Sequence, residues 1–387
     1  MADSPLAADA RARLIAFYLP QMYPIPENDR WWGPGFTEWT SVAEAQPLFA
    51  GHRQPRVPAD LGFYDLRLPE SRIAQADLAR AHGIEAFCYW HYWFSGKRLL
   101  DRPFAEVLGS GEPDFPFCLA WANQPWTDTW LGSGRALQDQ HYSHDDDVRH
   151  AQFLATAFAD PRYVRVDGRP LFAIYRPSDL PDPARTVETL RGEAARLGVG
   201  EPLVLGIDGW AVGHDFRADG LDGTISFAPR LDLLPHNNYS PLLARPWRKV
   251  ARTVRNARQG VGSTTLKVYD YRQHRAAVRQ MRAGFTHPYY PTTLVGWDNT
   301  PRRGKAAVVM LNDDPEHFAD DLAELVEAAA VKPFDDRLVF VNAWNEWAEG
   351  NYLEPDSDRG SAMLEAVARV NAVDERDVDA PLRASAP

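Results

Sequence analysis

The chain alternates short apolar runs with helical patterns, and this alternation constrains the fold more than any other feature of the sequence. Amphipathic helical patterns lie between several runs, at 69–82, 145–159, 184–197 and 315–330. Eight runs are apolar almost without interruption, as expected of strands buried on both faces: 13–19, 84–90, 115–121, 170–176, 202–208, 222–227, 292–297 and 337–344. Strands that alternate with helices form parallel βαβ units, and eight such units close most naturally into a barrel. We therefore expect an α/β fold, a single (β/α)8 TIM barrel with long loops after its strands.

The competing fold for such a pattern is a doubly wound open sheet. A dinucleotide-binding sheet of that kind needs a glycine-rich turn between a strand and the helix that follows it. The glycine-rich stretch 131–135 does not open a helix after a strand, which disfavours this alternative. We expect one catalytic domain over 13–372, an N-terminal extension over 1–12, and a disordered C-terminal tail over 373–387.

Charge and hydropathy exclude several classes of partner. The formal net charge is −11, whereas a nucleic-acid-binding protein needs a basic face to neutralise phosphates. No apolar run reaches the roughly 18 residues of a membrane-spanning helix, and the acidic N-terminus lacks the features of a signal peptide. We therefore expect a cytoplasmic protein that does not bind nucleic acid, with export by another route left open. The sequence does not predict an oligomeric state.

Three further features have both a structural and a functional interpretation. The basic stretch 247–258 indicates either a solvated helix face or a peripheral contact with an anionic glycan or with a lipid diphosphate that carries one. Cys88 and Cys118 lie in strand-like runs, so we expect buried, reduced thiols. The acidic segment 144–147 resembles a metal cluster, but it begins a helix, where aspartates favour the positive end of the dipole. We expect no metal and no cofactor.

Aromatic residues are the unusual part of the composition, with 13 Trp, 14 Tyr and 18 Phe. In a parallel barrel, chemistry takes place at the carboxyl ends of the strands, where the loops converge. Most tryptophans fall at these ends together with polar residues, and the flat C–H faces of sugar rings stack on indoles. This asymmetry predicts a cleft for an oligo- or polysaccharide. The expected substrate-binding residues are Trp32, Glu38, Trp39, Trp90, His91, Tyr92, Trp93, Trp121, Asn123, Gln124, Trp126, Tyr175, Asp208, Trp210, Trp297, Asp298, Asn342, Trp344, Asn345, Trp347 and Glu354.

The strongest candidates for catalysis are Glu346 and Glu349, which follow the last expected strand. Glycosidic chemistry needs one protonated carboxyl group to donate to the leaving oxygen and one carboxylate to act as base or nucleophile. We expect Trp344 and Trp347 to wall this pair and to raise one of the two pKa values by desolvation. The alternative is a solvated helix start, because Glu-x-x-Glu is common on surface helices.

Structural roles compete with substrate binding at several other positions. His91 is either a partner of a sugar hydroxyl or a packed histidine. Asp298, Asn123 and Gln124 either hold hydroxyl groups or cap turns. Glu354 is either a substrate contact or a loop charge.

Six segments carry a resemblance to a known family. They are 17–21, 27–40, 54–67, 89–100, 296–302 and 342–356, the last beginning Asn-Ala-Trp-Asn-Glu-Trp-Ala-Glu-Gly. Over nearly its whole length, the chain resembles the WbsX-like proteins of bacterial O-antigen and capsule gene clusters, which are related to glycoside hydrolase family 99. The resemblance implies a (β/α)8 barrel and a metal-independent enzyme that acts on glycans.

Family 99 consists of endo-acting α-mannosidases, and a Glu-Trp-x-Glu-Gly segment carries their chemistry. By this resemblance, Glu346 matches the residue that deprotonates the sugar 2-hydroxyl, whose oxygen then attacks C1 to give a 1,2-anhydro sugar. Glu349 matches the general acid that protonates the leaving oxygen and then activates water. The resemblance therefore implies a retaining hydrolase of an α-linked, mannose-like bacterial polysaccharide or surface-glycan intermediate.

One segment departs from the pattern of the WbsX-like proteins, which usually read Trp-Ala-Asn-Glu and continue with basic residues. Here Gln124 replaces the carboxylate and Asp128 occupies a position that is often basic. An amide cannot ionise, so we expect the substrate contacts at this position to differ from those of the family. Two alternatives stay open: a WbsX-like glycosyltransferase in O-antigen or capsular polysaccharide biosynthesis, and a non-catalytic glycan-binding barrel.

Overall fold

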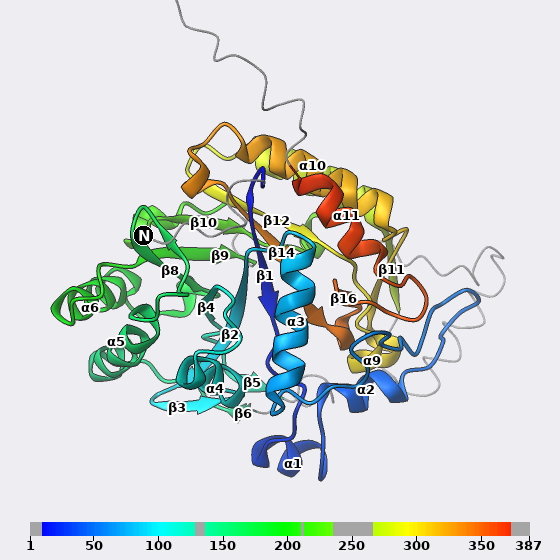
Figure 1. Cartoon of the computed structure of the whole chain (residues 1–387), viewed down its shortest axis with the longest axis horizontal. Coiled ribbons are helices and arrows are strands. Elements are labelled where there is room, and N and C mark those ends of the chain that lie inside the picture. Colours follow the sequence, from blue (N-terminus) through cyan, green and yellow to red (C-terminus); the bar gives the residue numbers. More distant parts are fainter. Residues whose placement is uncertain (1–9, 128–135, 210–212, 235–265, 373–387) are drawn as a thin grey trace, which may run out of the picture.

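A closed ring of parallel strands forms the centre of the computed structural model, which describes residues 10–127, 136–209, 213–234 and 266–372 (Figure 1). In chain order the ring contains β1 (Arg13–Tyr18), β2 (Ala86–Phe94), β4 (Phe117–Trp121), β8 (Arg169–Ile174), β9 (Leu203–Asp208), β10 (Gly223–Ser226), β12 (Tyr289–Leu294) and β14 (Leu338–Asn342). β1 pairs in parallel with β2 on one side and with β14 on the other, which closes the ring. The predicted (β/α)8 barrel is confirmed.

Helices cover the outside of the barrel. They are α3 (Pro69–Ala81), α4 (Arg102–Ser110), α5 (His144–Phe158), α6 (Pro183–Arg196), α8 (Tyr271–Ala283), α10 (Pro315–Ala329) and α11 (Ala362–Asn371). The four helices expected from the sequence are α3, α5, α6 and α10, each confirmed to within one residue at either end. Local signals explain such boundaries: the side chain of Asp182 caps α6 by accepting from the backbone N–H of Arg185, and Asp314 caps α10 in the same way.

The expected strands agree with the observed ones, and the largest differences are at β12 and β2. β12 begins at Tyr289 instead of 292, and β2 ends at Phe94 instead of 90. Val295 still donates its backbone N–H to the carbonyl of Asn342 at 2.9 Å, but Trp297 belongs to a different pairing. The carbonyl of Trp297 accepts from the backbone N–H of Met310 at 2.7 Å, on β13 (Val308–Leu311). β13 pairs in parallel with β11 (Lys267–Asp270) in a small sheet outside the barrel.

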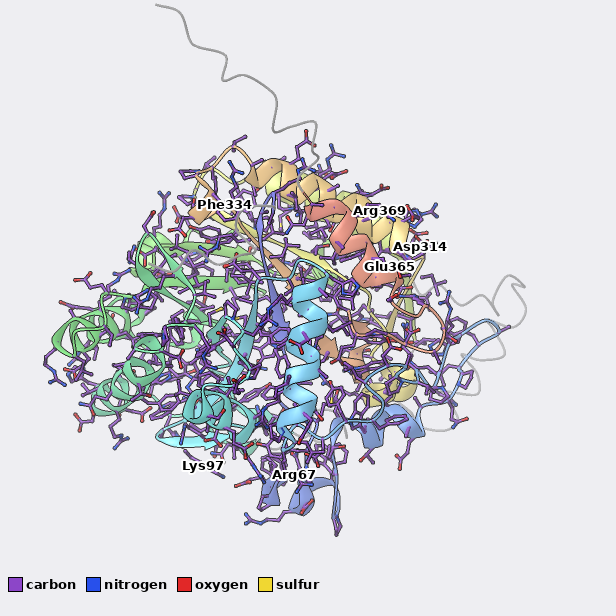
Figure 2. The ribbon with its side chains drawn as sticks, in the orientation of Figure 1. Arg67, Lys97, Asp314, Phe334, Glu365 and Arg369 are labelled. Atoms are coloured by element: carbon purple, nitrogen blue, oxygen red, sulfur yellow. The ribbon has the colours of Figure 1, made fainter. Side chains whose placement is uncertain are left out.

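Short elements gather at the carboxyl ends of the barrel strands. In Figure 1 the β1 arrow points toward the edge at which α1 (Pro26–Trp32) and α2 (Glu38–Glu44) lie. Figure 2 labels Arg67 and Lys97 near this edge, and Phe334, which precedes β14, near the opposite one. The other short elements at these ends are α9 (Thr300–Arg303), β3 (Lys97–Leu99), β5 (Trp126–Thr127), β6 (Ala136–Gln138), β15 (Asn345–Glu346), the 3-10 turn η8 (Trp347–Glu349) and β16 (Asn351–Tyr352). β7 (Arg165–Val166) instead pairs with the first residues of β8.

Aromatic rings fill the inside of the barrel. The ring of Phe17 on β1 stacks on Trp90 of β2 at 4.9 Å between centroids and on Phe340 of β14 at 5.4 Å. Inward-facing side chains of this kind make a closed eight-stranded barrel a packed core. Cys88 and Cys118 face each other in register on β2 and β4, and both are free and buried, as predicted.

Several predictions fall on residues outside the described part of the chain: the basic stretch 247–258, Trp210, and the C-terminal tail 373–387. The division into extension, catalytic domain and tail therefore stays a prediction. Within the described ranges, the helices are too short or too polar to cross a lipid bilayer.

Candidate active site

Three loops at the carboxyl ends of β1, β12 and β14 bring one arginine and three glutamates together. Glu38 is the first residue of α2, where the side chains of Thr37 and Thr40 form a capping box. Arg302 lies on the short helix α9 after β12. Glu346 ends β15, and Glu349 ends η8, directly after β14. We call Glu38, Arg302, Glu346 and Glu349 the mouth cluster.

The guanidinium group of Arg302 joins the three carboxylates. Its Nη1 donates to Glu349 Oε1 at 2.7 Å, and its Nη2 donates to Glu346 Oε2 at 3.1 Å. Glu38 Oε1 accepts from Nη2 at 2.5 Å and from Nε at 3.1 Å. A planar guanidinium with donors in a fixed fork can serve several carboxylates at once. The two predicted catalytic residues thus share one partner.

Burial of this cluster controls its protonation. The Glu346 residue is 8% exposed and Glu38 is 2% exposed. The pKa of Glu346 is raised to about 8: burial contributes most, Arg302 opposes it, and the negative charges of Glu349 and Glu38 add to it. Burial also raises the pKa of Glu349. Because buried uncompensated charge is costly, the pair Glu346 and Glu349 keeps a proton to a higher pH than carboxyl groups in water do.

Asp298 holds the loop that carries Arg302. One of its carboxylate oxygens accepts from the backbone N–H and hydroxyl of Thr300 at 3.1 and 2.6 Å, at the start of α9. The other oxygen contacts His52 Nε2 and the amide of Gln54, each at 2.8 Å. Burial alone would raise the pKa of Asp298, but the hydrogen bond with His52 and the charge of Arg56 hold it below its ordinary value. Asp298, a predicted site residue, therefore holds the start of α9 in place and with it Arg302.

The backbone of Asp298 also holds Glu349. Its N–H donates to the carbonyl of Glu349 at 2.6 Å. A side chain at Gly350 would meet the Cβ of Asp298 at 2.8 Å, and Gly350 has a φ of +60°. Only glycine fits such a close approach in this conformation, so the contact fixes the end of η8.

Aromatic side chains from β2, and from the segments that follow β4 and β8, lie on the mouth-cluster side of the barrel, which we call the mouth. Trp90 is 9% exposed and packs edge-on against Tyr175 at 5.3 Å. Burial raises the pKa of Tyr92, and the charge of Glu346 adds to this effect, so Tyr92 lies within range of the mouth cluster. Trp126 packs edge-on against Tyr92 at 5.1 Å and is half-buried. Trp32, at the end of α1, is also half-buried.

His91, Trp93 and Trp121 face the other side of the sheet. His91 Nε2 lies 3.0 Å from Nε2 of His150 on α5, and Trp93 stacks on the same His150 at 4.7 Å. Trp121 packs edge-on against His150 at 4.6 Å. All three lie between the barrel and α5, so the structure does not bring them to the mouth. His91 is therefore a packed histidine, the structural alternative given above.

Trp344 and Trp347 are both 0% exposed, so neither indole presents an open face to a substrate. Trp347 stacks on Tyr352 at 3.8 Å and donates from Nε1 to Glu354 at 2.6 Å. Burial raises the pKa of Glu354 to about 7. The indole of Trp347 therefore packs against its own loop, and burial of this loop desolvates Glu346 and Glu349.

The remaining expected residues have structural partners. Asn123 accepts from the backbone N–H of Arg176 at 2.7 Å, and Asp208 forms a fully buried ion pair with Arg230 at 3.0 Å. Gln124 accepts from Arg176 at 3.5 Å. Four others are buried: Trp39 donates to the carbonyl of Tyr64, Asn342 to that of Ala228 and Asn345 to that of Leu19, and Trp297 packs in a second apolar cluster with Met310.

Four residues of this site were not predicted from the sequence: Arg302, His52, Gln54 and Arg56. All four lie in segments 54–67 and 296–302 or directly beside them, so the motifs marked the region without indicating the pairing. A basic residue soon after the end of a barrel strand, in a chain with two candidate carboxylates after the next strand, is the signal that would have found Arg302.

Two proteins of Xanthomonas campestris are similar to this chain in sequence. The chain is 41% identical over 357 residues to "Uncharacterized protein WxcX" of Xanthomonas campestris pv. campestris strain B100, covering 92% of this chain and 49% of that protein. A second WxcX, from strain ATCC 33913, is 40% identical over 365 residues with the same coverage. The chain thus spans about half the length of these relatives.

Solved structures share the fold at low sequence identity. A GH99 endo-alpha-mannosidase from Bacteroides thetaiotaomicron aligns with a TM-score of 0.54 and 16% identity, over 92% of this chain and 96% of that one. A "Glycoside hydrolase-like protein" aligns with a TM-score of 0.56 and 13% identity, over 95% of each chain. Residues 14–367 match the family described as Glycosyltransferase WbsX. The chain therefore belongs to the WbsX family.

Proposed function

We propose that this chain is a carbohydrate-active enzyme that hydrolyses an α-linked, mannose-like bacterial glycan with retention of configuration. The observation that carries the proposal is the pair Glu346 and Glu349, which is buried at the carboxyl ends of the barrel strands and joined through Arg302. Paired carboxyl groups that share a proton are what glycoside cleavage requires. Trp90, Tyr92 and Trp126 lie on the same side of the barrel and supply apolar faces for sugar rings.

The proposed first step uses both carboxyl groups at once. The reactive form of the pair is the one in which Glu346 is ionised and Glu349 holds the proton. Carboxylate Glu346 takes the proton of the sugar 2-hydroxyl while O2 attacks C1, and the bond from C1 to the leaving oxygen breaks. Protonated Glu349 gives its proton to that oxygen. The products of this step are the freed glycan and a 1,2-anhydro sugar.

In the second step, water attacks C1 and opens the three-membered ring. Glu349, now a carboxylate, takes a proton from the water, and Glu346 returns its proton to O2. Two inversions at C1 give net retention, and both residues return to their starting states. Neither carboxylate needs to bond to C1, so the spacing rule for covalent retaining enzymes does not apply.

A glycosyltransferase in O-antigen or capsular polysaccharide synthesis is the second candidate, because the family description names that activity. A transferase of this kind takes its sugar from a nucleotide donor. Titration calorimetry with a set of nucleotide sugars tests this candidate: saturable binding would favour the transferase, and no heat of binding would favour the hydrolase.

The hydrolase is tested by incubating the protein with bacterial surface glycans that contain α-linked mannose or related sugars. We expect newly formed reducing ends whose first-formed anomer, followed by proton NMR, has the configuration of the bond that was cleaved. An inverted first product would overturn the mechanism. Binding without cleavage, unchanged in Glu346→Gln and Glu349→Gln, would indicate a non-catalytic glycan-binding barrel.

A further inference from the structure

The mouth cluster contains one more carboxyl group than glycoside cleavage needs. Two carboxyl groups are sufficient for the chemistry, yet Glu38 is a third, 2% exposed and bonded to the same guanidinium. Three carboxylates and one guanidinium carry a net charge of −2 when all are ionised. Neither Glu38 nor Arg302 has a step of its own in the proposed reaction, so their presence at the centre of the site needs an explanation.

The N–H groups of Arg302 donate to three different carboxylates. Nε and Nη2 both donate to Glu38, which orients the guanidinium plane through two donors on one edge. Nη1 is thereby directed to Glu349, while the second hydrogen of Nη2 reaches Glu346. The contact to Glu349 is 2.7 Å and that to Glu346 is 3.1 Å, so the two carboxyl groups are held on different nitrogens at different distances.

We propose that Arg302, oriented by Glu38, is a positioning residue that sets the spacing and the proton distribution of Glu346 and Glu349. The inference rests on the proposed function only in one respect, namely that the proton held by Glu346 and Glu349 is used to cleave a glycan. An opposite charge within about 4–6 Å favours the ionised carboxylate, whereas a like charge favours the protonated one. Arg302 therefore lowers the proton affinity of both acids, and Glu38 raises it.

Every charged group that faces the pair contributes to this balance. Glu38 approaches from α2, Tyr92 from β2, and Arg302 and Arg303 from α9. Burial raises the pKa of both catalytic acids, Arg302 opposes this, and Arg303 also lowers the pKa of Glu349. A lysine at 302 would keep the charge but could not reproduce the fork, because an ammonium group is a compact point charge.

The test is a direct titration, which needs no substrate. Protein labelled with carbon-13 at the glutamate side-chain carboxyl is followed by NMR from acid to alkaline pH, and Glu346→Gln and Glu349→Gln assign the two signals. We expect the Arg302→Met variant to titrate at a pH higher by about one to three pH units. Glu38→Gln should move the same signals to lower pH, because it removes a negative charge and frees donors of Arg302. Arg302→Lys should give an intermediate titration.

The matched control is Arg272→Met, which removes an arginine that pairs with Asp270 at the start of α8. It should leave both signals unchanged. If Arg302→Met does not fold, Glu38→Gln still decides the matter, because a merely structural role predicts no shift toward lower pH. Unchanged titration in Glu38→Gln, or ordinary titration of both acids in the unmodified protein, overturns the proposal. Absence of glycan cleavage with these shifts present would overturn the proposed function alone.

Discussion

Two sides of this barrel look alike in the sequence and differ in the structure. Tryptophan and histidine lie in the last residues of β2 and β4, as in His91, Trp93 and Trp121. Tryptophan and glutamate follow the end of β14, as in Glu346, Trp347 and Glu349. The first group packs against His150 on α5, whereas Glu346 and Glu349 meet Arg302 at the mouth.

The difference comes from the alternation of side chains along a strand. Successive residues of a barrel strand face the axis and the helices in turn. On β2, Trp90 packs against Phe17 inside the barrel and His91 contacts α5. A position at the end of a strand is therefore not sufficient to predict a site residue, because its parity along the strand decides which side it faces. The predictions below test this contrast.

The largest effect is expected at the mouth. Glu349→Gln and Glu346→Gln should each lower kcat by about 100- to 10,000-fold, as expected for loss of a general acid or base. Circular dichroism should show a folded protein, because glutamine keeps the shape of the side chain. His91→Asn should keep the kcat of the folded fraction, and a loss as large as that of the glutamate variants would place His91 in the site.

On the α5 side, the expected effect is on stability. Trp121 is 1% exposed, and Trp121→Ala should lower the free energy of unfolding by about 3–5 kcal/mol because it leaves a cavity. Urea unfolding measures this change, and kcat at a temperature where the variant is folded should persist. A folded variant of normal stability with lost activity would contradict the assignment of Trp121 to the core.

The histidine pair should make the α5 side sensitive to acid. Burial lowers the pKa of His91 to about 3 and that of His150 well below its usual value. The folded state therefore binds fewer protons than the unfolded state, so stability is full above the unfolded pKa of about 6.5 and is lost as pH falls below it. His91 alone should cost about 2 kcal/mol at pH 5 relative to pH 7.5.

Urea unfolding at the two pH values measures this effect. Carboxyl groups with raised pKa values have the opposite pH dependence, so the unmodified protein is compared with His91→Asn. The variant should lose less stability between pH 7.5 and pH 5 than the unmodified protein does. Equal losses would show that His91 titrates normally.

The smallest effect is expected at Gln124, near the edge of the mouth. Gln124 accepts from Arg176 at 3.5 Å, and Gln124→Glu would place a carboxylate beside that guanidinium. A partly exposed ion pair contributes about 0.2–1 kcal/mol, so thermal unfolding should change little. The KM for the glycan should change while kcat stays close to normal. A large fall in kcat would show that position 124 takes part in the chemistry.

Most of the fold could be predicted because apolar runs and helical periodicity are local signals. The eight strands and the helices α3, α5, α6 and α10 follow from these signals. The end of β12 was predicted too far along the chain because Trp297 pairs with Met310 of β13, a contact between segments that no local pattern reveals.

The candidate site could be predicted only in part. Glu346 and Glu349 were found because they follow a strand directly, whereas Arg302 was missed because its pairing depends on the loops after β12 and β14 meeting in space. The roles of Trp344 and Trp347 could not be predicted either, because the burial of a loop side chain depends on what packs beneath it. Trp347 rests on Tyr352 and bonds Glu354, and both follow in the same loop.

The most direct test of the central claim compares two leaving groups in the Glu349→Gln variant. Fluoride leaves without protonation, whereas the oxygen of a glycosidic bond needs a proton from the general acid. In single turnover, we expect the variant to cleave the natural linkage at least about 100-fold more slowly than the unmodified protein, and to release fluoride from the corresponding glycosyl fluoride at nearly the normal rate. Equal losses on both substrates would contradict the role of Glu349 as the acid.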